Sequence, residues 1–221
     1  MGRFKMPKVA GREVAFIMAT RVEYGAELAK RFDPFICEVG PVEAALHTAR
    51  YLAENPCDLV VHLGSGGSKR LEQGAIFQIT SVAYRDMDAS AFGFDKGVTP
   101  FSGLPATITI PHRIEGIAEA SLSTGASVVS GDGFDVIAED IVDMESWAVL
   151  RAAQVAGIPY IGLRGVSDGA EPVSGYSDWT KLLGLLDERL AEAVDQLVEQ
   201  LESGSLLTQP CAPPDAKIQG R

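Results

Sequence analysis

Three carboxylates stand just beyond apolar runs of the sequence. Glu23 comes after the run at 14–18, Glu145 after the short run at 141–144, and Asp168 after the run at 158–163. Because the strands of α/β folds present their functional groups at a common edge, we expect these side chains to meet over one pocket. Carboxyl groups in such a place donate protons, accept protons or stabilise a developing positive charge. The pattern therefore predicts acid–base chemistry.

Two glycine-rich turns accompany the carboxylates. Gly64-Ser65-Gly66-Gly67 follows the strongly apolar run at 58–63, and Gly131-Asp-Gly133 stands directly before Phe134. Structural explanations stay open for all of these residues. Ser65 suits a turn, Phe134 suits a core, and Asp168 suits the cap of a loop. A carboxylate at the start of a helix is also stabilised by the helix dipole, and this explanation applies to Glu23 and Glu145.

The elements that must position these residues alternate between strands and helices, which indicates an α/β fold. Strands are predicted at 14–18, 35–37, 58–63, 76–83, 108–110, 126–130 and 158–163. Helices are predicted at 22–32, 41–54, 113–123, 145–156 and 179–201, and a long loop at 84–104. Several strands are apolar throughout, as in a sheet covered on both faces. We expect one domain over 13–202, a flexible N-terminus over 1–12, and a disordered tail over 203–221.

Composition narrows the classes of function. The chain has 221 residues, 46% of them hydrophobic, and a formal net charge of -11. So acidic a chain lacks the electrostatic footprint of a nucleic-acid-binding protein and is repelled by anionic membranes. It contains no apolar run of about 18 residues, which excludes a membrane span. Its three cysteines form no CxxC pair, and we expect a reducing, cytoplasmic location. Its three histidines are too scattered to predict a metal site.

Taken together, the motifs resemble a known family. Asp143-Met-Glu145-Ser-Trp-Ala, Gly157-Ile-Pro-Tyr and Arg164-Gly-Val-Ser-Asp168-Gly-Ala170 keep the order and spacing of its "MEA…VPF…RAISD" block. The segment from Asp86 to Phe94 is similar to its "HDADVTAFGY" loop. The family is that of the bacterial 5'-methylthioadenosine/S-adenosylhomocysteine nucleosidases, within the nucleoside phosphorylase/hydrolase superfamily. The resemblance covers most of residues 14–201. It implies a three-layer α/β/α fold with a central mixed, mostly parallel sheet.

The resemblance also implies catalytic roles. Asp168 would protonate N7 of adenine, with Ser167 orienting its carboxyl group. Glu23 would be the general base for the attacking water. Glu145 would bind the ribose hydroxyls, with Met144 against the sugar. No metal or organic cofactor is needed for this hydrolysis of an adenine nucleoside.

Further residues are assigned to substrate binding by the same resemblance. Ser65 and Gly66 would position the water or ribose, and Phe134 would pack on the purine. Phe92 and Pro100 would close the pocket for the 5'-substituent in the neighbouring subunit of a homodimer. Two other sets are implied as well. An aromatic lid would come from Tyr176 or Trp179, and small residues of the 5' pocket from Thr20, Val39 and Ala89.

The chain departs from the family pattern in ways that keep alternatives open. Only Glu23 remains of three consecutive glutamates, and Arg21 now stands nearby. Arg21 would lower the pKa of Glu23, bind an acidic group of the substrate, or face solvent. Asp135 replaces an apolar residue next to Phe134. Phosphorolysis needs cationic groups for phosphate, yet His62 stands where related phosphorylases have arginine. A non-catalytic nucleoside-binding protein is the third hypothesis.

Overall fold

The computed structural model describes residues 7–169, 171 and 175–206, which form both strands and helices; residues 59–143 contain strands and short 3-10 turns but no α-helix. The strands are β1 (Lys8–Val9), β2 (Arg12–Met18), β3 (Phe35–Ile36), β4 (Leu59–Gly67), β5 (Ile76–Tyr84), β6 (Thr107–Thr109), β7 (Ala118–Thr124), β8 (Ile141–Asp143) and β9 (Tyr160–Asp168). The helices are α1 (Ala26–Ala29), α2 (Pro41–Glu54), α3 (Ser146–Ala156), α4 (Tyr176–Thr180) and α5 (Leu183–Ser203), with 3-10 turns η1 (Arg21–Glu23), η2 (Ser90–Phe92) and η3 (Gly131–Val136).

The sheet is mixed and partly closed on itself. β4 pairs in parallel with β2 and β9, and β7 pairs in parallel with β5 and β8. Antiparallel pairings of β9 with β5, and of β8 with β4, join these groups into a ring. Five of the nine pairings between described strands are parallel. The predicted α/β class with a mixed, mostly parallel sheet is therefore confirmed.

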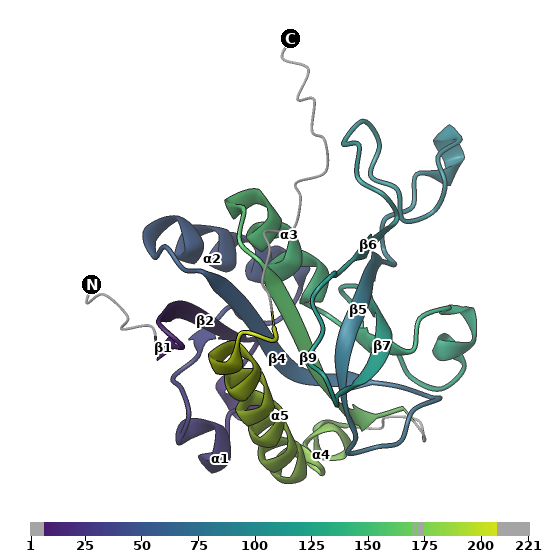
Figure 1. The fold of residues 1–221 in the computed structure, drawn as a ribbon. Coiled ribbons are helices and arrows are strands. Elements are labelled where there is room, and N and C mark those ends of the chain that lie inside the picture. The colour runs from purple at the N-terminus through teal and green to yellow at the C-terminus, as the bar shows by residue number, and fades with distance from the viewer. Residues whose placement is uncertain (1–6, 170, 172–174, 207–221) are drawn as a thin grey trace.

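Helices cover both faces of the sheet, with α2 and α3 on one side and α1 and α5 on the other (Figure 1). Alternate residues of β2 point to the two layers. Ala15 and Ile17 belong to the core beneath α2 and α3, whereas Val14, Phe16 and Met18 belong to the core beneath α5. A strand buried on both faces needs apolar residues at every position, which explains the unbroken apolar run.

Three predicted elements differ from the structure. The helix predicted at 113–123 is wrong, because residues 118–124 form β7. Pairing with β5 and β8 on both edges outweighs the helical propensity of this Ala- and Glu-containing segment. The strand predicted at 126–130 is wrong as well, since these residues form an irregular loop. The helix predicted at 22–32 is divided into η1 and α1 around Gly25.

Two strands run further than their apolar cores suggest. β4 continues through the glycine-rich turn to Gly67, and β9 continues to Asp168. Their parallel register places Gly66 beside Val166 and Gly67 beside Asp168. This extension brings the polar ends of the two strands together.

No helix among the described residues is long and apolar enough to span a membrane. The expectations for residues 1–6 and 207–221 lie outside the described residues.

Candidate active site

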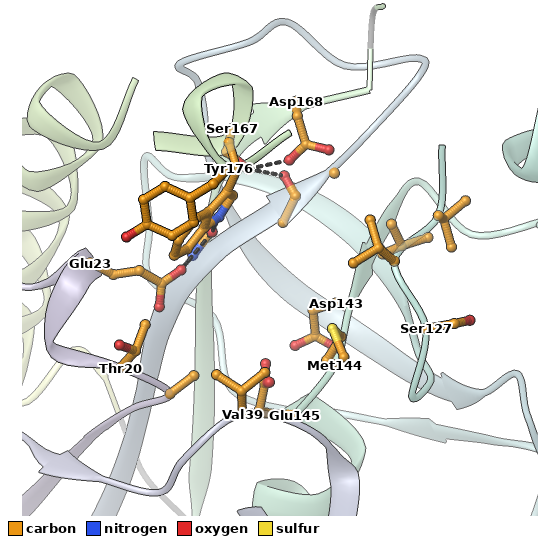
Figure 2. A pocket seen from close by; sticks show the side chains of 18 of the residues that line it. Thr20, Glu23, Val39, Ser127, Asp143, Met144, Glu145, Ser167, Asp168 and Tyr176 are labelled. Atoms are coloured by element: carbon orange, nitrogen blue, oxygen red, sulfur yellow. Dashed lines mark hydrogen bonds between the residues drawn. The ribbon is translucent and has the colours of Figure 1, made fainter. Parts of the chain in front are cut away.

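A pocket of about 620 Å³ opens at the carboxyl ends of β2, β4, β8 and β9. Glu23, Glu145 and Asp168 all line it, from different elements of the fold (Figure 2). The predicted convergence of the three carboxylates is therefore observed. Of the other predicted site residues, Ser65, Gly66, Met144 and Ser167 also line the pocket.

Glu23 lies in η1, directly after β2, and is only 8% exposed. Its Oε1 accepts hydrogen bonds from the Ser65 backbone N–H at 2.8 Å and from the Ser65 hydroxyl at 2.5 Å. Gly64 permits this approach, because a Cβ there would stand 3.1 Å from Glu23 Oε2. Burial raises the pKa of the Glu23 carboxyl, while the two Ser65 hydrogen bonds act to lower it. Glu23 is thus a buried carboxyl group whose charged form is stabilised by hydrogen bonds from Ser65 of β4.

Asp168 ends β9 and is partly buried at the rim of the pocket. The Ser167 hydroxyl donates to its Oδ1, and the same hydroxyl lies 3.4 Å from the Gly66 carbonyl. Burial raises the pKa of Asp168, and the Ser167 hydrogen bond acts in the opposite sense. Gly67 faces the carboxyl closely, since a Cβ at that position would lie 3.0 Å from Asp168 Oδ2. Partial burial therefore makes this carboxyl bind a proton more tightly than an exposed aspartate does.

Glu145 precedes the first turn of α3 and is 7% exposed. Its Oε1 accepts the Gly40 backbone N–H at 2.8 Å. Burial and, after it, the nearby charge of Asp143 raise the pKa of Glu145 to about 8, while the Gly40 hydrogen bond acts to lower it. The dipole of α3 explains why an acidic residue stands directly before this helix, yet the Glu145 side chain faces the pocket (Figure 2).

A buried ion pair supports the floor of the site. Arg164 is 1% exposed, and its Nη2 lies 2.8 Å from Asp143 Oδ2. Thr124 donates to the other Asp143 oxygen at 2.7 Å, and the Ser146 backbone N–H donates to Oδ2 at 2.9 Å. Burial and Arg164 lower the pKa of His62 well below its usual value, so its imidazole is neutral. His62 is structural, packed against Arg164 behind the pocket.

Cationic groups are scarce at the pocket surface. Among the residues that the structure describes, Arg85 is the single cationic side chain in the lining. Its guanidinium donates to the carbonyls of Ser123, Asp143 and Ser127 at 2.6, 3.0 and 2.7 Å. Arg21 does not line the pocket; it is 58% exposed and pairs with Asp33 at 3.3 Å. The structure thus favours the solvent-facing hypothesis for Arg21.

Four residues with predicted or questioned roles lie apart from the pocket lining of the described chain. Phe134 is 7% exposed and sits behind Gly67, with its Cζ 3.3 Å from a Cβ built there. Asp135 pairs with Lys69 at 2.5 Å on the surface. Phe92 is 85% exposed on the loop between β5 and β6, where Pro100 also lies. Of the small residues expected in the 5' pocket, Thr20 and Val39 line it.

Sequence reasoning missed or left undecided several lining residues. Tyr176 and Trp179 were alternatives for one aromatic residue of the pocket, and both line it from α4. Arg85 and the apolar pair Val128 and Val129 were missed. The apolar pair falls in the segment wrongly predicted as a strand. An arginine directly after a strand was the signal that pointed to the pocket edge.

Comparisons with known proteins agree with this geometry. The sequence profile of the phosphorylase superfamily matches residues 2–199. A 5'-methylthioadenosine/S-adenosylhomocysteine nucleosidase of Actinobacillus succinogenes is 28% identical over 184 residues, covering 74% of this chain and 79% of that protein.

Solved structures share the fold. A 5'-methylthioadenosine/S-adenosylhomocysteine nucleosidase from Colwellia psychrerythraea 34H in complex with adenine has a TM-score of 0.73 at 22% identity, covering 85% of this chain and 95% of that one. A futalosine hydrolase mutant of Helicobacter pylori has a TM-score of 0.73 at 18% identity, covering 85% and 98%. With a profile match over nearly its whole length and the same fold, this chain belongs to the phosphorylase superfamily.

Proposed function

We propose that this protein hydrolyses the N-glycosidic bond of 5'-substituted adenosines, releasing adenine and the 5'-substituted ribose. The observation that carries the proposal is the convergence of three buried or half-buried carboxylates on one pocket. The similarity to nucleosidases at 28% identity supports an adenine nucleoside as the substrate class. Candidate substrates are 5'-methylthioadenosine, S-adenosylhomocysteine and 5'-deoxyadenosine.

The proposed reaction uses each carboxylate once. Asp168 donates its proton to N7 of adenine as the bond between C1' and N9 breaks, and the bonding electrons leave with the base. A water oxygen bonds to C1', and its proton passes to Glu23. The sugar resembles an oxocarbenium ion in the transition state, which the Glu145 carboxylate stabilises while it binds the ribose hydroxyls. Ser167 orients the acid, and Met144 packs against the sugar.

Water is favoured over phosphate because the arginines at and near the described pocket are engaged by other groups. Arg85 donates from Nη1 and Nη2 to backbone carbonyls. Arg21 pairs with Asp33 outside the lining, and Arg164 pairs with Asp143. A phosphate ion needs such donors to offset its charge. Glu23 would in addition repel an anion beside Ser65. These contacts support hydrolysis rather than phosphorolysis.

An adenine-release assay tests the proposal. The purified protein is incubated with 5'-methylthioadenosine, S-adenosylhomocysteine, 5'-deoxyadenosine and adenosine, each with and without phosphate. We expect adenine release that is independent of phosphate. Release that requires phosphate and yields a sugar 1-phosphate would overturn hydrolysis. Nucleoside binding without release of adenine would instead support the non-catalytic hypothesis.

The long loop between β5 and β6 supports a second part of the proposal, a homodimer. This segment projects beyond the sheet (Figure 1) and carries Phe92 and Phe101, 85% and 97% exposed. Exposed aromatic side chains of this kind mark interaction surfaces. We expect the loop of one subunit to reach the partner's pocket, with Phe92 and Pro100 closing it around the 5'-substituent. Light scattering after size exclusion gives the mass; a monomer at micromolar concentration would contradict this arrangement.

Cys37 and Cys57, the cysteines of the described residues, form no disulfide, and this supports the proposal of a cytoplasmic location.

A further inference from the structure

A hydrogen-bond chain reaches the candidate base from the aromatic side of the pocket. Trp179 of α4 points its indole Nε1 at the Ser65 hydroxyl, 2.9 Å away. The Ser65 hydroxyl in turn lies 2.5 Å from Glu23 Oε1. Figure 2 labels Glu23 and Tyr176 at this side of the pocket, and the Tyr176 ring packs edge-on against the indole of Trp179. The chain links a short helix of the pocket rim to a carboxylate buried beneath it.

The chemistry of the three groups decides which of them donates in each hydrogen bond of this series. An indole N–H donates and cannot accept, whereas a serine hydroxyl has one proton to give and lone pairs that accept. The Ser65 hydroxyl therefore accepts from Trp179, and its own proton is left to point at Glu23. Without the indole, the hydroxyl is free to rotate away from the carboxylate.

The direction matters because the ionised form of Glu23 is costly to bury. Burial raises the pKa of the Glu23 carboxyl, and the hydroxyl and backbone of Ser65 supply the largest opposing effects. The other charged or titratable groups acting on the carboxyl are Arg164 from β9, which favours the charge, and Asp143 from β8, which opposes it. Cys37 and Glu145 also lie within its electrostatic reach. The indole N–H donates to Ser65 and to none of these groups in the described structure.

We infer that Trp179 is a positioning residue, whose indole N–H fixes the Ser65 hydroxyl as a donor to Glu23 and so keeps the base ready to accept a proton. The inference rests on the proposed function for the role of Glu23 as a base. The hydrogen-bond chain itself can be tested without turnover.

The first test follows the indole directly. The chain has two tryptophans, so ¹⁵N-labelled protein gives two indole N–H signals, and Trp147→Phe assigns them by elimination. We expect the Trp179 signal to shift as Glu23 titrates, and to lose that pH response in Glu23→Gln and in Ser65→Ala. A Trp179 signal with the same pH response in all three proteins would overturn the inference, whether or not the protein is a nucleosidase.

The second test is the pH profile of kcat/KM for adenine release. Trp179→Phe keeps an aromatic ring and removes the N–H. A hydroxyl freed among three staggered positions donates to Glu23 about a third of the time, so the acidic limb should move upward by about half a pH unit. Ser65→Ala removes the hydroxyl and should move the limb further. The double variant should match Ser65→Ala, because Trp179 acts through that hydroxyl.

A matched control comes from the same helix. Tyr176→Phe removes a hydroxyl from the ring that packs edge-on against Trp179 at 5.4 Å, without removing the indole N–H. The acidic limb should stay in place in this control, whatever happens to the height of the profile. An unmoved limb in Trp179→Phe, combined with a moved limb in Ser65→Ala, would overturn the inference and leave the proposed hydrolysis intact. Absence of adenine release in the unaltered protein would overturn the proposed function, and the indole titration would still decide the hydrogen-bond chain.

Discussion

Replacing Glu145 by glutamine should make the protein more stable at alkaline pH while it removes activity. The carboxyl is 7% exposed, and burial together with Asp143 raises its pKa to about 8 from an ordinary 4.5. The folded protein therefore binds this proton more tightly than the unfolded chain does. Its free energy of unfolding should fall as pH rises from about 4.5 towards about 8. Glutamine is neutral at every pH and retains an oxygen for the Gly40 N–H.

The size of this effect follows from the pKa. Each pKa unit corresponds to about 1.4 kcal/mol, so the rise from 4.5 to about 8 amounts to an upper limit of about 5 kcal/mol. Relaxation around the ionised carboxylate and coupling to Asp143 reduce the amount that is observed. The stability of Glu145→Gln relative to the unaltered protein should grow between pH 5 and pH 9 and level off above the folded pKa.

Urea unfolding of both proteins at intervals across that range measures the difference. Glu199→Gln, a change on the exposed surface of α5, controls for the loss of one negative charge. Above pH 8, where Glu145 is ionised, adenine release should fall in Glu145→Gln by about 10²-fold, because a neutral amide stabilises the oxocarbenium-like sugar poorly. A stability difference that stays constant with pH would refute the reasoning about burial. Full activity would refute the role at the ribose.

Four further outcomes are expected. Asp168→Asn should lower turnover by about 10²–10⁴-fold with nucleoside binding retained in calorimetry, and near-normal turnover would show that the acid is another group. Arg164→Met should cost about 3–5 kcal/mol of stability in thermal unfolding, since it leaves Asp143 charged and buried; an unchanged melting temperature would contradict this. Gly67→Ala should lower kcat, because the new Cβ stands 3.0 Å from Asp168 Oδ2, and Gly184→Ala, which meets no atom within 4 Å, is its control. Phe92→Ala should raise KM for substrates with large 5' groups more than for adenosine, and equal effects on both would place the loop outside the pocket.

The sequence predicted best the features that depend on local patterns. The helix 41–54 was predicted to the residue, because Gly40 and Pro41 mark its start and an amphipathic pattern runs through it. The end of α3 at Gly157 was predicted as well, and this glycine has the left-handed φ of 71° that a helix C-terminus favours. Three carboxylates predicted from their places after apolar runs do converge on one pocket.

The errors arose where long-range contacts decide the structure. Residues 118–124 carry Ala and Glu, which favour a helix, yet two neighbouring strands provide hydrogen-bond partners on both edges of β7. The irregular loop at 126–130 is held by Arg85, forty-two residues away from Ser127 along the chain, through a side-chain hydrogen bond. No window of local sequence contains both partners. Trp179 and Ser65, separated by 114 residues, present the same difficulty.

The proposed preference for hydrolysis over phosphorolysis follows from how the molecule uses its arginines. A cation buried behind a pocket stabilises the fold only if a carboxylate meets it, and Arg164 is matched by Asp143 in this way. Burial raises the pKa of both Glu23 and Glu145, and the buried charge of Arg164 opposes this rise only in part. An ionised Glu23 in this pocket repels a second anion, whereas a neutral nucleophile meets no such repulsion. Water is neutral and phosphate is not, and this difference is the electrostatic reason for proposing hydrolysis.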